Sequence, residues 1–143
     1  MCNIEVKKDN MMYLKYKIKS LYWDLRARCQ RFMRGYSYGD VWNMDDWFIR
    51  TLKPMLTHLR DYGCGVPLDF EFHEDQWNAI LSEMIDCLKL MDEDNAKKHL
   101  GFNTAKDVCN MTIEDIRKRK DLMEKNKNRF FELFSKYFYN LWD

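Results

Sequence analysis

Apolar residues recur at steps of three and four along most of the chain, and this spacing restricts the fold to packed α-helices. In the first third of the chain the pattern is carried by Leu14, Ile18, Leu21, Leu25, Cys29 and Phe32. Residues at these steps share one side of an α-helix, whereas a half-buried strand would need strict alternation. Gly35 follows the last turn, where helices commonly end in a left-handed residue. We therefore predict a first helix over about residues 11–34.

The same period continues in three later segments. We expect helices over about residues 43–62, 73–92 and 112–141. The clearest of these has a predicted buried face formed by Trp77, Ile80, Leu81, Met84, Ile85, Leu88 and Met91. Residues 93–111 are polar and are interpreted as a surface linker, with one short helical turn near residues 104–108.

Helices with one apolar side each bury that side by packing on one another. The predicted fold is therefore all-α, an irregular four-helix bundle that forms a single domain over residues 1–143. The 5 Gly and 2 Pro provide few tight turns, which argues against a β-sandwich. The 5 Cys include no C-x-x-C pair, which is typical of reduced thiols in a cytosol. No apolar run approaches the roughly 18 residues that a membrane span needs, so we expect no membrane association.

The formal net charge of +1 conceals three charged stretches. Residues 7–34 hold nine Lys/Arg against two Asp, residues 69–94 hold nine Asp/Glu against one Lys, and residues 117–129 hold seven Lys/Arg against two acids. One interpretation is that basic and acidic helices lie side by side in the bundle. The other is that basic faces of the first and last helices contact nucleic-acid phosphates. That second hypothesis uses Lys15, Lys19, Arg26, Arg117, Lys118 and Arg119.

A dense group of aromatic residues lies where the first helix ends and the next begins. Ser37 is spaced to cap a single helical turn, because its oxygen can accept a hydrogen bond from an otherwise unpaired amide. One interpretation is a small satellite core that clamps two helix ends. The other is an anchor in a protein interface, since Trp, Tyr and Arg supply most interface hot spots. The candidate partner-binding residues are Tyr36, Tyr38, Asp40, Trp42, Asp45 and Asp46.

The residues for catalysis are not grouped in the sequence. The three histidines lie in different segments, and no nucleophile motif accompanies them. Asp40, Asp45 and Asp46 could bind Mg²⁺, which prefers oxygen ligands, but helix capping accounts for the same residues more simply. We therefore expect a non-enzymatic protein without a metal or cofactor.

Three sequence patterns together resemble a group of small proteins encoded by tailed bacteriophages and prophages. They are RGYSxxDxWNxDxW at residues 34–47, GxGxP at residues 63–67 and EDQWNxIL at residues 74–81. The resemblance covers roughly residues 34–88. It implies a viral origin and a bacterial cytoplasm, but no mechanism.

The expected function is therefore that of a phage-encoded interaction protein. Its partner would be a host or viral protein complex, and inhibition of a host defence complex is one form this could take. The alternative is a nucleic-acid-binding accessory factor that uses the six cations named above. The sequence does not fix the oligomeric state.

Overall fold

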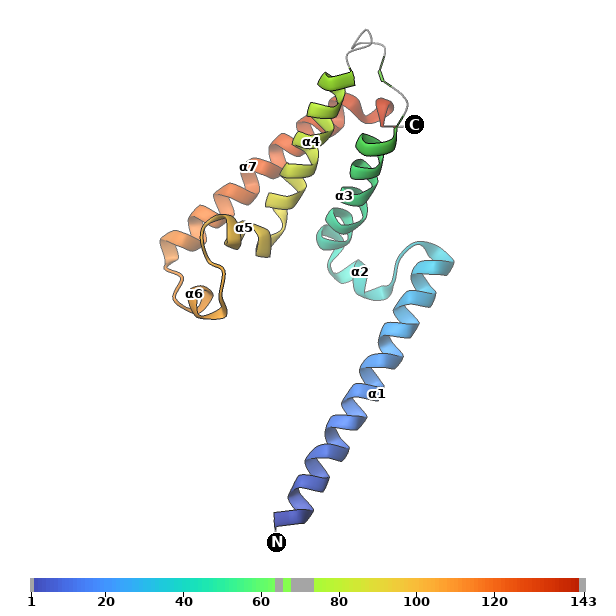
Figure 1. The fold of residues 1–143 in the computed structure, drawn as a ribbon, viewed down its shortest axis with the longest axis vertical. Coiled ribbons are helices and arrows are strands. Elements are labelled where there is room, and N and C mark those ends of the chain that lie inside the picture. The colour runs from blue at the N-terminus through green and yellow to red at the C-terminus, as the bar shows by residue number, and fades with distance from the viewer. Residues whose placement is uncertain (1, 64–65, 68–73, 142–143) are drawn as a thin grey trace. The chain divides into compact units, whose positions relative to one another are not determined.

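The chain is helical throughout the parts that the computed structural model describes, which are residues 2–63, 66–67 and 74–141, with side chains from residue 13 onward. The helices are α1 (Cys2–Arg34), α2 (Tyr38–Trp42), α3 (Met44–Tyr62), α4 (Glu74–Met91), α5 (Glu93–His99), α6 (Ala105–Cys109), α7 (Ile113–Tyr137) and the short 3₁₀ helix η2 (Phe138–Asn140) (Figure 1). No strand occurs within these ranges. The predicted all-α bundle is confirmed. The chain divides into two compact units, residues 1–44 and 45–143.

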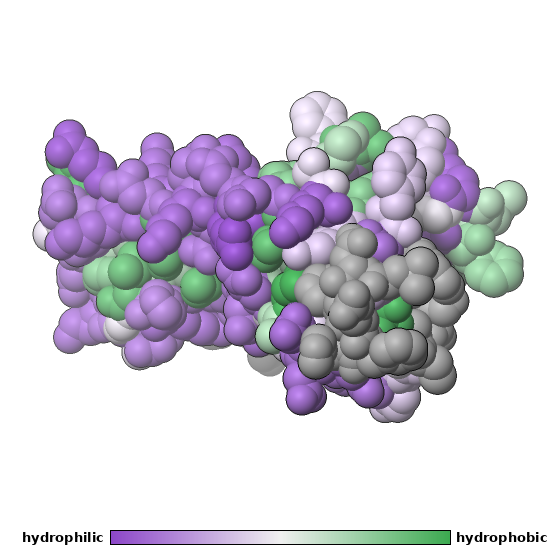
Figure 2. Space-filling view, turned by 90° about the horizontal axis from the view of Figure 1, so that it is seen from above, coloured by the Kyte–Doolittle hydropathy of each residue, from purple (hydrophilic) through white to green (hydrophobic). Residues whose placement is uncertain are grey.

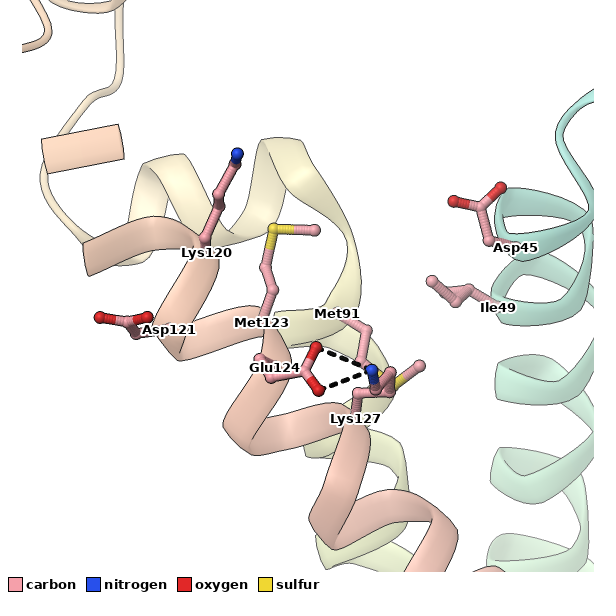
Figure 3. Close-up of a pocket in the computed structure, with 8 residues that line it drawn as sticks. All are labelled: Asp45, Ile49, Met91, Lys120, Asp121, Met123, Glu124 and Lys127. Carbon is pink, nitrogen blue, oxygen red and sulfur yellow. Dashed lines mark hydrogen bonds and ion pairs between the residues drawn. The ribbon is translucent and has the colours of Figure 1, made fainter. Parts of the chain in front are cut away.

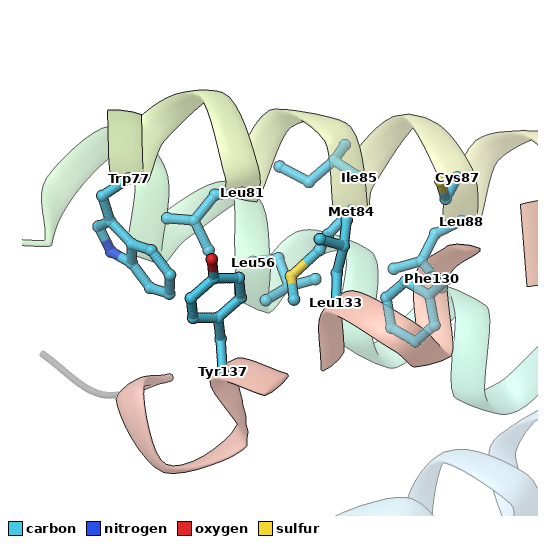
Figure 4. Close-up of a cluster of buried hydrophobic side chains, with 10 residues drawn as sticks. All are labelled: Leu56, Trp77, Leu81, Met84, Ile85, Cys87, Leu88, Phe130, Leu133 and Tyr137. Carbon is cyan, nitrogen blue, oxygen red and sulfur yellow. The ribbon is translucent and has the colours of Figure 1, made fainter. Parts of the chain in front are cut away.

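The hydrophobic core lies in the second unit, where α4 and α7 lie side by side and α3 adds side chains (Figure 1). Its buried members are Leu56 from α3, then Trp77, Leu81, Met84, Ile85, Cys87 and Leu88 from α4, and Phe130, Leu133 and Tyr137 from α7 (Figure 4). The predicted buried face of α4 is confirmed, with Ile80 and Met91 partly buried at its edges. Burying each Leu-, Met- or Phe-sized side chain contributes about 1.5–3 kcal/mol before entropy is subtracted.

Aromatic contacts join α3 to the second half of α7. The Phe48 ring lies 6.0 Å from the Phe130 ring edge-to-face, and it stacks on Phe131 at 5.9 Å between ring centroids. Phe130 in turn stacks on Phe134 at 5.4 Å. Offset-stacked and edge-to-face pairs each add about 0.5–1.5 kcal/mol beyond area burial. The sequence change along α7, from basic to aromatic, therefore marks where this helix enters the core.

Opposite charges lie side by side in the second unit. The Arg129 guanidinium of α7 donates to both carboxylate oxygens of Glu83 on α4, at 2.6 and 3.2 Å. Arg119 of α7 pairs with Glu93 of α5 at 2.8 Å. For the last helix, the interpretation that basic and acidic helices pair within the bundle is therefore confirmed.

The predicted linker at residues 93–111 is wrong in its structure, because α5 and α6 lie within it. The Asp92 carboxylate accepts a hydrogen bond from the Asn95 amide at 2.8 Å and starts α5. Ala96 on α5 is fully buried, so this short helix has one anchored side despite its polar sequence. The helical turn expected near residues 104–108 is confirmed as α6, which begins with a capping box formed by Thr104 and Asp107.

The apolar stripe of α1 differs from the prediction, which had it buried in the bundle. The helix begins at Cys2, well before the predicted start near residue 11. The stripe residues are 56% to 93% exposed; they are Leu14, Ile18, Leu21, Leu25 and Phe32. Hydrophilic residues dominate the face of the molecule seen in Figure 2, where hydrophobic residues form separate clusters. Among the described helices, none is both long and apolar enough to cross a membrane.

Gly35 ends α1 in the left-handed conformation that the sequence predicted. Its φ is +80°, and its amide donates to the Arg31 carbonyl at 2.9 Å. We expect Gly35→Ala to destabilise the first unit by about 1 kcal/mol, because an L-residue is strained at this φ. Gly39→Ala is the matched control, since an added Cβ there meets its nearest atom at an ordinary 3.7 Å. Urea unfolding of both variants, followed by helical circular dichroism, checks this; equal midpoints would contradict it.

Candidate partner-binding site

A forked ion pair holds α2 against the end of α1. The Arg31 guanidinium donates to Asp40 Oδ2 at 2.9 Å and to Asp40 Oδ1 at 2.6 Å. The same carboxylate accepts from the amide and the hydroxyl of Ser37, at 2.7 and 2.9 Å. Asp40 is only 4% exposed. Because bidentate charge-assisted hydrogen bonds fix geometry as well as adding energy, a five-residue helix is held in one place.

These contacts also set the protonation state of the carboxylate. Hydrogen bonds from the Arg31 guanidinium hold the pKa of Asp40 well below its usual range, and the bonds from Ser37 act in the same direction. Burial opposes them, because it disfavours the charged form. The net effect keeps Asp40 ionised at every pH near neutrality. The predicted cap at Ser37 is confirmed as a capping box.

Arg34 organises the aromatic residues that follow it. Its guanidinium carbon lies 4.7 Å from the ring centroid of Tyr36 and 4.3 Å from that of Tyr38. Its Nε also donates to the Tyr36 carbonyl at 3.1 Å, and the Tyr38 amide donates to the Gln30 side chain at 3.0 Å. Cation–π contacts of this kind are worth about 0.5–1 kcal/mol at exposed sites. We call the residues Arg34, Tyr36, Tyr38 and Trp42 the aromatic corner.

The aromatic corner presents its rings to solvent. Trp42 is 89% exposed, and Tyr36 and Tyr38 are also exposed. The interpretation of these rings as a small satellite core therefore fails for Trp42. Asp40 must be removed from the candidate partner-binding residues, because it is buried and both of its oxygens are occupied by Arg31 and Ser37. Its role is to position the corner.

Asp45 and Asp46 belong to the second unit, at the start of α3. Both are exposed, and Asp46 pairs with Arg50 at 3.1 Å. Within the described part of the chain, His, Cys, Asp and Glu side chains do not gather in threes as a metal site would require. The Mg²⁺ hypothesis also loses Asp40, whose carboxylate is already bound by the Arg31 guanidinium.

A groove in the second unit was not predicted from the sequence. It has a volume of about 470 Å³ and is lined by Asp45, Ile49, Met91, Lys120, Asp121, Met123, Glu124 and Lys127 (Figure 3). Ile49, Met91 and Met123 supply apolar surface, and the Lys127 ammonium pairs with Glu124 at 2.7 Å. These residues come from α3, α4 and α7, so only tertiary packing brings them together. Charges of both signs at the rim do not select one class of ligand.

The six cations of the nucleic-acid hypothesis lie in both units. Lys15, Lys19 and Arg26 are exposed on α1, with Arg26 placed 5.3 Å over the Trp23 ring. On α7, Arg117 and Lys118 are exposed. The Arg119 side chain is only 16% exposed and pairs with Glu93. Arg119 therefore belongs to the packing of α7 on α5 and is not placed to contact phosphates.

No family model, curated protein or solved structure matches the chain.

Proposed function

We propose that this is a non-enzymatic, phage-encoded protein that acts in the bacterial cytoplasm by binding a host or viral protein through its aromatic corner. The observation that carries the proposal is the 89% exposure of Trp42 beside a buried ion pair. The viral origin comes from the sequence resemblance alone. Among host proteins, a defence complex is the target class that such an origin favours.

Two properties of the corner support binding over a purely structural role. An exposed tryptophan has no stabilising function in the free chain, whereas a partner that buried it would gain a large apolar contact. Tyr38 and Arg34 flank it on a segment held by the Arg31–Asp40 pair. Because the segment is already ordered, a partner would lose little affinity to immobilising it.

The test compares two exposed aromatic side chains. We expect Trp42→Ala to lower the recovery of a protein partner from bacteriophage-infected cells at least tenfold, because truncating a hot-spot residue costs about 2 kcal/mol or more. The measurement is quantitative mass spectrometry after affinity capture with the tagged full chain.

Tyr139→Ala is the matched control, since Tyr139 is 88% exposed in η2 of the second unit. It should leave recovery unchanged. A partner set that is identical for wild type and Trp42→Ala would remove the corner from the binding site.

The alternative function, a nucleic-acid-binding accessory factor, draws support from the exposed cations Lys15, Lys19 and Arg26 of α1. It loses support from Arg119, which is paired within the second unit. We therefore rank it below protein binding.

A further inference from the structure

The apolar stripe on α1 is separate from the aromatic corner and has a distinct pattern. Ile18, Leu25 and Phe32 are spaced by seven residues, and Leu14 and Leu21 form a second series with the same spacing. These are the alternating a and d positions of a coiled-coil heptad. All five side chains are exposed, and we call them the seam. At 1.5 Å per residue, the seam is about 27 Å long.

Within the first unit, α2 is placed on the opposite side of α1. The contacts from α2 and its cap reach Gln30 and Arg31. Helical spacing puts these two residues away from the seam, and Ala27 and Gln30 are accordingly half-buried. The groove between α1 and α2 is likewise lined by Ala27, Gln30 and Arg31. The short helix thus covers the polar side of α1 and leaves the seam open.

Cations border the seam on both sides. Helical spacing places Lys15, Lys19 and Arg26 along one edge, and Lys17 and Arg28 along the other. The flanking charge has one exception, Asp24. Residues beside an apolar seam choose the partner helix, because opposite charges attract across it and like charges repel.

The width and charge of the seam distinguish between possible occupants. A second copy of the chain would bring two rows of cations together, which is unfavourable. A lipid surface is better matched by a broad apolar face than by a narrow a/d seam. Nucleic acid would use the cations but leave the apolar side chains uncovered. An acidic helix satisfies both features at once.

We infer that the seam of α1 is a second interaction surface, which binds an acidic amphipathic helix of a partner protein in a coiled-coil arrangement. This inference does not depend on the aromatic corner, because the two surfaces share no residue. It adds a partner class, a helix with acidic residues beside its own heptad, to a chain whose corner would bind through aromatic contacts.

The test uses the full chain and two synthetic peptides that each contain four heptads with leucine at a and d. One peptide carries glutamate at e and g, and the other carries lysine. Fluorescence anisotropy at low ionic strength should show at least about tenfold tighter binding of the acidic peptide, with the preference falling as salt is added. Equal affinity for both peptides, or no binding of either, would overturn the inference.

Variants separate the seam from its flanks. Leu21→Gln with Leu25→Gln should abolish peptide binding, whereas Ser20→Gln, on the polar side of α1, should not change it. Replacing Lys15, Lys17, Lys19 and Arg26 by glutamate should reverse the preference toward the basic peptide. Circular dichroism confirms that each variant keeps its helices.

Three further results would overturn the inference in favour of another occupant. They are self-association in sedimentation that the seam variant removes, binding of anionic phospholipid vesicles in place of the acidic peptide, and a fall in melting temperature caused by the seam variant alone. Trp42→Ala should leave peptide affinity unchanged. Failure of the corner and failure of the seam are therefore distinguishable.

Discussion

Replacing Phe130 by alanine is expected to lower the free energy of unfolding of the second unit by about 3–5 kcal/mol. Phe130 is fully buried and packs against the rings of Phe48, Phe131 and Phe134. The change removes apolar area and leaves a cavity between α3 and α7 that the rigid surroundings fill only in part. Urea unfolding at equilibrium, followed by tryptophan fluorescence and circular dichroism, measures the loss.

Tyr139→Ala provides the control for this change. Tyr139 is almost fully exposed, so its loss should alter the free energy of unfolding by no more than about 0.5 kcal/mol. If Phe130→Ala cost as little as this control, the α3–α7 aromatic contacts would not be part of a packed core.

The second large effect is expected at Asp40. Asp40→Ala leaves the buried amide and hydroxyl of Ser37 without their acceptor and releases Arg31. An unsatisfied buried donor costs about 1–3 kcal/mol, so α2 should open more easily. The amide of Asn43, which donates to the Gly39 carbonyl at the end of α2, should exchange about tenfold or more faster with solvent. Unchanged exchange would show that the ion pair does not hold α2.

The same contact predicts a dependence on pH with a definite sign. The pKa of Asp40 is lowered in the folded chain, so its contribution to stability is fully present above the ordinary carboxyl pKa of about 3.9. It is lost progressively as the pH falls below that value toward the lowered pKa. After correction for intrinsic exchange rates, protection of α2 should therefore decline in acid for wild type and should not decline further for Asp40→Ala.

The sequence predicted the elements whose apolar residues are regularly spaced. The period of α4 was strong enough to give its buried face before any coordinates, because six or seven apolar side chains at steps of three and four can meet only on one side of a helix. Gly35 and Thr112 were also informative. The first ends α1 at a positive φ, and the second starts α7 with a capping box to Asp115.

Two parts of the fold could not be predicted from local pattern. The helix α5 is polar in sequence, and it is anchored through Ala96 and the Glu93–Arg119 pair, both of which depend on tertiary packing. The exposure of the α1 seam was missed for the opposite reason. An apolar stripe shows that a helix has a side to bury, but does not say whether the covering surface belongs to the same chain.

The candidate site was predicted in part. The concentration of tyrosine and tryptophan at residues 36–42 correctly marked exposed side chains, with Trp42 the most exposed of them. Asp40 looked similar in the sequence, yet its carboxylate is consumed by Arg31, nine positions earlier in the chain. No local spacing rule identifies such a pair, since it depends on the direction in which the chain reverses after Gly35.

The division of labour at this reversal has an evolutionary consequence. Arg31, Ser37 and Asp40 hold the backbone, whereas Tyr38 and Trp42 face outward and contribute little to that framework. Substitutions at the two outward positions should therefore alter which target is recognised without unfolding the turn. A viral lineage facing a changing host could diversify these positions at little risk, and a library randomised there would provide new binders on the same support.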